Sequence, residues 1–383
     1  MQHVHAADSD SDAIRSPIVV DTPGALQELA DVLATQPRVA VDTEANSLYA
    51  YQEQVCLIQL SIPGANYLVD PLALDDMSAL GPFFADPQLE KVFHAADYDL
   101  IVLLRDFGFV TRHIFDTMWA ARILGWPKVG LADILASHFG VEVNKRYQRY
   151  DWGLRPLDPK ALRYAWMDSY YLLPLREIQK AELQETGRWA EAQEVFDYLT
   201  SSVTLPSDNP GRFFWRIKGL HALSSYDQRV LYQLYLWREE VAEALDRPPV
   251  KVMANHRLVR IARLQPRTRE ELAAAGLTPG QIRRFGRSLL KALRREPPAA
   301  LPEPPHHERP PDDALERFQT LKAWRKDVAH VRGVDSDVIL PNAALWELAE
   351  HPPHDLDDLL EVPGIGPWRQ STYGPDLLEL ISE

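Results

Sequence analysis

The chain has 383 residues and carries 41 lysines and arginines against 55 aspartates and glutamates, a formal net charge of −14. With 46% hydrophobic residues it has globular composition, and a single core rarely exceeds roughly 300 residues, so we expect more than one folded domain. Residues 1–16 are polar and acidic and are expected to form a disordered tail and not a secretory signal. We expect no membrane span, because no apolar run approaches the roughly 20 residues required. The single cysteine, Cys56, excludes an internal disulfide and favours a cytoplasmic protein.

The charge is unevenly distributed along the chain. Residues 211–300 hold 18 lysines and arginines against 8 acidic residues, a net charge of +10. Residues 1–210 carry −14 and residues 313–383 carry −8. The average therefore argues against a polyanionic partner, whereas the basic middle block favours one.

Residues 17–205 alternate strand and helix patterns, which predicts an α/β domain. Asp116 is a predicted helix N-cap, and Gly108 a predicted helix stop. Pro63-Gly64 predicts the turn of a hairpin. In chain order we expect a helix at 25–35, strands at 38–44, 55–62, 65–72 and 91–96, and helices at 99–108, from 117, and from 158 to about 180.

The rest of the chain is predicted to be helical. Within residues 211–296, helices are expected at 225–246, 256–263, 268–275 and 278–295. A proline-rich linker follows at residues 297–313. Residues 314–383 are helical again, with a Pro-Gly-Ile-Gly turn, so that the two helical blocks are candidates for a diverged repeat.

A candidate metal site begins at the end of the strand at 38–44. Asp42 and Glu44 are two residues apart on a strand, so both carboxylates point to the same face. Two like charges beside an apolar strand repel each other, and a divalent cation would remove that repulsion. Taken alone, the pattern also fits two exposed acids at a strand end.

Two further patterns are ambiguous when considered singly. Tyr164 and Asp168 are four residues apart on a helix and therefore face one site, although such pairs also arise by chance. Asp99 follows a strand near a helix start and also fits a capping role. His94 is expected to be a core histidine and not a general base.

Together and in this order, these residues resemble the signature of the DEDD exonuclease superfamily, in its tyrosine-bearing branch, and within that branch the ribonuclease D family. The resemblance covers roughly residues 17–383. It rests on the segments VDTEANS (41–47), VCLIQL (55–60), VDPL (69–72), FHAADYDL (93–100), FDTMWAARILG (115–125), DWGLRPL (151–157) and YAWMD (164–168).

The resemblance implies a fold and a chemistry. It implies a ribonuclease H-like mixed sheet flanked by helices over residues 17–205, and small all-α HRDC domains at 211–296 and 314–383, the second supported mainly by its position. Asp42, Glu44, Asp99 and Asp168 would hold two divalent cations, Mg²⁺ or Mn²⁺, which prefer oxygen ligands. Tyr164 would orient the attacking water, since a phenol is protonated at neutral pH. Trp166 is bulkier than the residue typical of its place in the family.

The basic block carries cationic stripes without acids, which favours contacts to RNA phosphates. One stripe lies at steps of three or four residues and comprises Arg257, Arg260, Arg263 and Arg267. The other comprises Arg283, Arg287, Lys291 and Arg294. Lys145, Arg146, Arg149 and Arg155 form a third basic stretch that fits either phosphate contacts or a solvated loop.

The leading functional hypothesis is a monomeric 3′–5′ exoribonuclease that releases nucleoside 5′-monophosphates and trims tRNA precursors and other small structured RNAs. A 3′–5′ DNA exonuclease is an alternative, because the same site cuts either polymer. A non-catalytic nucleic-acid-binding adaptor is an alternative of another class, which the loss of any metal-binding carboxylate would favour.

Overall fold

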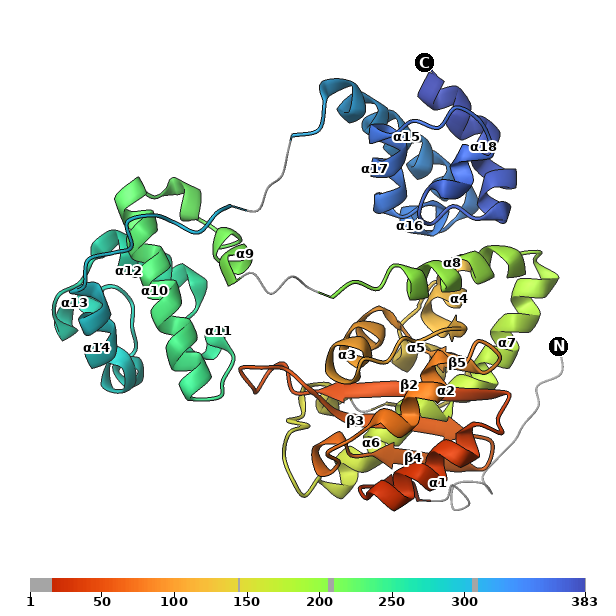
Figure 1. Cartoon of the computed structure of the whole chain (residues 1–383), viewed down its shortest axis with the longest axis horizontal. Coiled ribbons are helices and arrows are strands. Elements are labelled where there is room, and N and C mark those ends of the chain that lie inside the picture. The colour runs from red at the N-terminus through yellow and green to blue at the C-terminus, as the bar shows by residue number, and fades with distance from the viewer. Residues whose placement is uncertain (1–15, 144, 206–209, 305–308, 383) are drawn as a thin grey trace. The chain divides into compact units, whose positions relative to one another are not determined.

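The computed structural model describes residues 16–143, 145–205, 210–304 and 309–382. The chain divides into two compact units, of which one contains residues up to Ala45, Val55–Leu205 and the part from Arg309 onward. The other contains Asn46–Gln54 and Pro206–Glu308. Figure 1 labels the elements of both units, and each unit is described by itself. The predicted tail at 1–16 lies almost entirely outside the described residues, and the predicted domain boundaries stay a prediction.

The first unit is built on a six-stranded mixed sheet with the order β1-β4-β3-β2-β5-β6. β2 pairs with β3, and β3 with β4, in antiparallel fashion, whereas the other three pairings are parallel. The mixed sheet confirms the predicted fold class. The strands are β1 (Ile18–Val20), β2 (Arg38–Ala45), β3 (Val55–Ile62), β4 (Ala65–Val69), β5 (Glu90–Phe93) and β6 (Ile114–Asp116).

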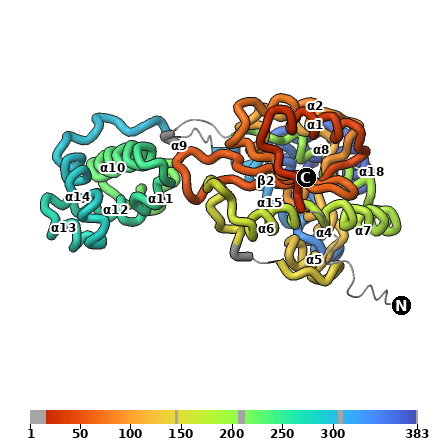
Figure 2. The backbone as a smooth tube through the Cα atoms, turned by 90° about the horizontal axis from the view of Figure 1, so that it is seen from below, coloured from red at the N-terminus to blue at the C-terminus, as the bar shows by residue number. Residues whose placement is uncertain are grey.

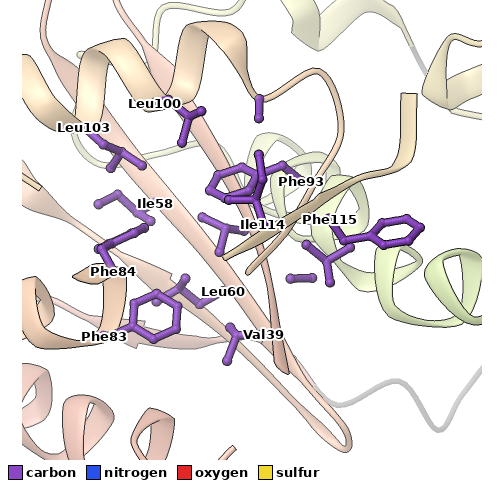
Figure 3. Packing of buried hydrophobic residues seen from close by; sticks show 14 of the residues in the cluster. Val39, Ile58, Leu60, Phe83, Phe84, Phe93, Leu100, Leu103, Ile114 and Phe115 are labelled. Atoms are coloured by element: carbon purple, nitrogen blue, oxygen red, sulfur yellow. The ribbon is translucent and has the colours of Figure 1, made fainter. Parts of the chain in front are cut away.

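Helices cover the sheet and bury its apolar residues. Val39 and Ile58 from the strands pack with Phe84, Phe93 and Leu100 in one core, seen in Figure 3. The helices of this domain are α1 (Pro23–Leu33), α2 (Gly81–Ala85), α3 (Asp97–Phe107), α4 (Thr117–Ile123), α5 (Leu131–Phe139), α6 (Pro159–Tyr170), α7 (Leu172–Glu185) and α8 (Trp189–Ser201). The short 3-10 helices are η1 (Pro71–Ala73), η2 (Ser78–Leu80) and η3 (Lys145–Arg149).

The single long helix predicted from residue 158 to about 180 is wrong. The structure has two helices there, α6 and α7, separated at Tyr171. The cause is Pro174 in the first turn of α7, because proline lacks an N–H and its ring clashes with a preceding helical turn. The break allows α6 to lie against β2 and β3 while α7 continues along β5.

The second unit contains a bundle of helices, of which α10, α12, α13 and α14 lie side by side in Figures 1 and 2. The bundle buries its own apolar core, which includes Leu231, Leu258 and Leu289. Its elements are α9 (Pro210–Trp215), η4 (Leu220–Ala222), α10 (Ser225–Ala244), α11 (Pro249–Val252), α12 (Asn255–Leu264), α13 (Arg269–Ala274) and α14 (Pro279–Leu293).

The C-terminal helices repeat this bundle within the first unit. They are α15 (Asp312–Arg332), α16 (Ser336–Ile339), α17 (Asn342–Glu350), η5 (Asp358–Glu361) and α18 (Pro367–Ser382). A buried arginine marks the repeat. Arg238 of α10 donates to the Met253 carbonyl and the Asn255 side chain. Arg325 of α15 donates in the same way to the Leu340 carbonyl and the Asn342 side chain. This shared network supports a diverged repeat.

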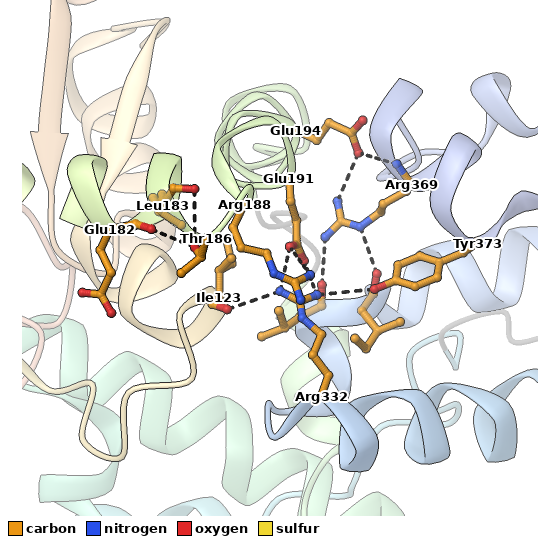
Figure 4. Close-up of polar contacts among 12 residues, drawn as sticks. Ile123, Glu182, Leu183, Thr186, Arg188, Glu191, Glu194, Arg332, Arg369 and Tyr373 are labelled. Carbon is orange, nitrogen blue, oxygen red and sulfur yellow. Dashed lines mark hydrogen bonds and ion pairs between the residues drawn. The ribbon is translucent and has the colours of Figure 1, made fainter.

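The C-terminal helical domain is attached to α8 by buried ion pairs, shown in Figure 4. Glu191 is fully buried and accepts hydrogen bonds from both terminal nitrogens of Arg332. Glu194 accepts hydrogen bonds from the backbone N–H groups of Trp368 and Arg369, at the N-terminus of α18. At α8 the acidic C-terminal domain thus contributes the arginines and the α/β domain the carboxylates, whereas at α4 the α/β domain contributes Arg122 against Asp335 and Asp337.

Helix α14 of the first bundle is equivalent to α18, but its N-terminus is capped by its own residues. There, Thr278 and Gln281 form a capping box on α14. On α18 the Glu194 carboxylate takes this role, and a Cβ at Gly366 would lie 2.6 Å from the Glu194 side chain. Glycine at this position therefore permits the close approach of α8.

Candidate active site

Asp42 and Glu44 lie on β2, a central strand of the sheet. They pair with Gln59 and Leu57 of β3, respectively. Because they are two residues apart on a regular strand, their side chains lie on the same face of the sheet. Both are only half-buried, so the site they form is accessible.

Asp99 reaches this site from the first turn of α3. Its carboxylate is buried and accepts a hydrogen bond from the Thr43 hydroxyl. Thr43 stands between the two acids of β2, so that this bond ties the start of α3 to the strand.

α6 supplies the remaining two predicted residues. Its Asp158 N-cap and Pro159 fix the start of the helix, and the helix packs across β2 and β3. Tyr164 and Asp168 then share one helical face, and the Tyr164 hydroxyl donates a hydrogen bond to the Asp168 carboxylate.

Three of the four predicted carboxylates form one cluster, and Asp99 lies beside it, close enough for its charge to raise the pKa of Asp42. Oxygens of Asp42, Glu44 and Asp168 lie within 4.8 Å of one another. Burial, together with the charges of its three acidic neighbours, raises the pKa of Asp42 well above its usual range. Burial also raises the pKa values of Asp99 and Asp168 to about 7. Such a set of acids in one place is expensive without a counter-charge, and an all-oxygen donor set fits a hard divalent cation.

Tyr164 is held in its neutral form. Burial, and then the charges of Asp168, Glu44 and Asp42, raise the pKa of its hydroxyl well above 10. A phenol in this environment donates a hydrogen bond and does not act as a free base.

Two neighbouring residues have structural roles, as predicted. Burial lowers the pKa of His94 to about 4, and its Nδ1 contacts the Thr117 hydroxyl. Asp116 caps α4 by accepting hydrogen bonds from the N–H groups of Met118 and Trp119.

Sequence reasoning matched the segment at residues 151–157 but missed the contacts that its side chains make. Trp152 of this loop is buried against Tyr164, with ring centroids 6.3 Å apart. Arg155 forms a bidentate ion pair with Asp70, at 2.6 and 2.7 Å. The segments VDPL and DWGLRPL were matched as motifs, but their pairing depends on the contact between Asp70 and Arg155, which are 85 residues apart in sequence. The phosphate-binding alternative for Arg155 is wrong, because its donors are used within the protein.

The predicted RNA-contacting residues divide into two groups. Arg263, Arg283, Arg287, Lys291 and Arg294 have exposed side chains. Arg257 donates to the Gln281 side chain and Arg260 to the Ala274 carbonyl, so both are partly engaged within the bundle. The stripe on α14 is therefore the more accessible.

The comparisons with known proteins agree with this arrangement. Residues 17–184 match the 3′-5′ exonuclease domain family, and residues 227–293 and 314–381 match the HRDC domain. The chain is 30% identical to a ribonuclease D of Acidiphilium cryptum, over 97% of this chain and 94% of that protein. It is 28% identical to a ribonuclease D of Escherichia coli, over 95% and 98% of the two chains.

A solved structure shows the same fold. The crystal structure of Escherichia coli RNase D, described as an exoribonuclease involved in structured RNA processing, covers 96% of this chain and 99% of its own, with a TM-score of 0.68 and 26% identity. Within the residues that the structure describes, no helix has both the length and the apolar character to cross a membrane. The mixed sheet, the carboxylate cluster and these similarities together show that the chain belongs to the ribonuclease D family of 3′-5′ exoribonucleases.

Proposed function

We propose that Asp42, Glu44, Asp99 and Asp168 hold two divalent cations, Mg²⁺ or Mn²⁺, and that Tyr164 completes the catalytic set. The observation that carries this proposal is the convergence of acids from β2, α3 and α6, whose carboxyl pKa values are raised in the metal-free chain. When bound, the cations supply the positive charge that in-line attack of water on phosphorus requires.

The side chains of the chain itself would then orient the reactants. The Tyr164 hydroxyl, neutral and anchored to Asp168, would position the attacking water by hydrogen bonding. Asp42, between Glu44, Asp99 and Asp168, is the candidate ligand shared by the two cations. The product would be a nucleoside 5′-monophosphate released from the 3′ end.

We further propose that the enzyme trims the 3′ ends of tRNA precursors and other small structured RNAs, as a cytoplasmic monomer. A structured substrate is supported by the exposed cations of α14, namely Arg283, Arg287, Lys291 and Arg294, which suit phosphate contacts that do not read sequence. The only cysteine, Cys56, is buried and has no second cysteine with which to form an internal disulfide, as in a protein of a reducing compartment.

The test compares 3′-extended tRNA with single-stranded DNA of equal length, each labelled at its 5′ end, with Mg²⁺, Mn²⁺ or EDTA. We expect stepwise shortening of the tRNA extension that stops near the mature 3′ end, and no activity in EDTA. Faster shortening of DNA would favour the DNA exonuclease instead. Internal cleavage fragments would contradict exonucleolytic trimming.

A further inference from the structure

The guanidinium of Arg155 is fully used inside the protein. Its Nε and one terminal nitrogen bind the two carboxylate oxygens of Asp70. The remaining N–H groups donate to the backbone carbonyls of Trp152, Leu154 and Cys56, at 2.7 to 2.8 Å. An arginine has five N–H donors, and here each has an acceptor, so none is left for a substrate phosphate.

These five bonds join three segments that are distant in sequence. The carbonyls of Trp152 and Leu154 belong to the 151–157 loop, and the Cys56 carbonyl belongs to β3. Asp70 follows β4 and also caps η1 by accepting from the Leu72 N–H. The loop is therefore fastened to the sheet beside Leu57, the residue that pairs with Glu44.

The fastened loop carries Trp152 into the site. The indole is 1% exposed and packs against the Tyr164 ring, and Tyr150 supports it from its edge, with ring centroids 5.0 Å apart. The indole N–H is buried, and among the described residues no acceptor meets standard hydrogen-bond geometry with it. It nevertheless lies close enough to the Glu44 carboxylate to lower the pKa of Glu44.

We propose that Arg155 and Trp152 are positioning residues for the reaction: Arg155 fixes the 151–157 loop, and Trp152 transmits this order to Glu44 and Tyr164. The inference rests on the proposed function, since it concerns the same carboxylate site. A buried donor without an acceptor is costly, so an orientation of Glu44 that accepts a hydrogen bond from the Trp152 N–H is favoured. Groups that orient metal ligands in this way typically change metal affinity or activity by about 10- to 100-fold when they are removed.

Two conservative variants test this. Arg155→Lys keeps the charge opposite Asp70 but cannot supply five donors, and Trp152→Phe keeps an aromatic ring but lacks the N–H. We expect each to weaken Mn²⁺ binding about tenfold, measured by titration calorimetry without RNA, and to lower kcat with little change in KM. The double variant should show Mn²⁺ affinity and kcat no lower than those of the more impaired single variant, because both residues act through the same contacts. Arg112→Lys, at an exposed arginine of the same domain, should match the wild type.

The contrary outcomes are distinct. A raised KM with unchanged kcat in Arg155→Lys would mean that Arg155 binds RNA, and unchanged Mn²⁺ affinity in both variants would reduce the network to loop stabilisation; either overturns the proposal. Thermal unfolding checks that each variant is folded. If Arg155→Lys does not fold, Trp152→Phe alone tests the proposal. If the wild-type chain binds no Mn²⁺, or if Asp42→Asn still shortens RNA, the proposed function itself fails.

Discussion

Glu191 provides the sharpest test of how the C-terminal domain is held. Its carboxylate is fully buried and accepts hydrogen bonds from Arg332 and Arg188, and Arg332 also donates to the Ile123 carbonyl. Glu191→Ala would leave two guanidinium groups facing each other without a counter-charge. Removing one partner of a buried ion pair costs about 3–5 kcal/mol.

This cost converts into a measurable change in thermal stability. For a folded unit of about 150–250 residues, 1 kcal/mol shifts Tm by roughly 2–4 °C, so Glu191→Ala should lower Tm by about 6–20 °C in scanning calorimetry. Glu185→Ala, at an exposed glutamate of the preceding helix α7, should change stability by less than about 0.5 kcal/mol. The double variant Glu191→Met/Arg332→Met should recover much of the loss, because it removes the buried Arg332 charge, while Arg188 has a side chain that is 33% exposed and can be solvated.

The reasoning is refuted if Glu191→Ala unfolds within 1 °C of the Glu185→Ala control, on the scale of roughly 2–4 °C per kcal/mol. It is also refuted if the loss of unfolding free energy in the double variant equals the sum of the losses in the two single variants. Residues in one ion pair are expected to show coupled and not additive effects.

Two further predictions concern the carboxylate cluster and the basic stripe. In the metal-free chain, the pKa values of Asp99 and Asp168 are raised to about 7, above the 3.8 expected of an unfolded chain. The stability that their bound protons contribute is therefore lost as pH rises from about 4 through 7, so Tm in EDTA should fall between pH 5 and 8. Over the same range Mn²⁺ affinity should rise, because binding releases these protons, and calorimetry measures both the affinity and the proton release. A flat affinity over this range would contradict the raised pKa values. Reversing the charges of Arg283 and Arg287 together should weaken RNA binding and reduce the slope of log K against log salt by about 2; an unchanged slope in a filter-binding titration would remove α14 from the RNA-contacting surface.

Local sequence patterns were sufficient to predict four of the six strands and the placement of most acids, whereas the three-residue strands β1 and β6 were not predicted. The period of two on β2 puts Asp42 and Glu44 on one face, and the i to i+4 spacing does the same for Tyr164 and Asp168 on α6. Asp116 and Gly108 mark the start of α4 and the end of α3, as N-cap and left-handed C-cap. These signals span only a few residues each, so they can be recognised in a single sequence.

The features that were not predicted depend on tertiary contacts. The acceptors of Arg155 lie on β3, after β4 and in its own loop, and no spacing rule brings them together. The attachment of the C-terminal domain shows the same limit. The C-terminal domain contacts α8 through Arg332 and Arg369, and it also pairs its acids Asp335 and Asp337 with Arg122 of α4. Regional charge counts do not reveal which few residues become buried.

We propose that the acids of β2, α3 and α6 form the site that removes nucleotides from an RNA 3′ end. The direct measurement follows release of nucleoside 5′-monophosphate from 3′-labelled RNA by the wild type and by Asp42→Asn, which keeps the size of the side chain but not its charge. We expect metal-dependent release by the wild type, and a loss of at least about 100-fold in the variant with RNA binding retained. Release by Asp42→Asn at the wild-type rate would contradict it.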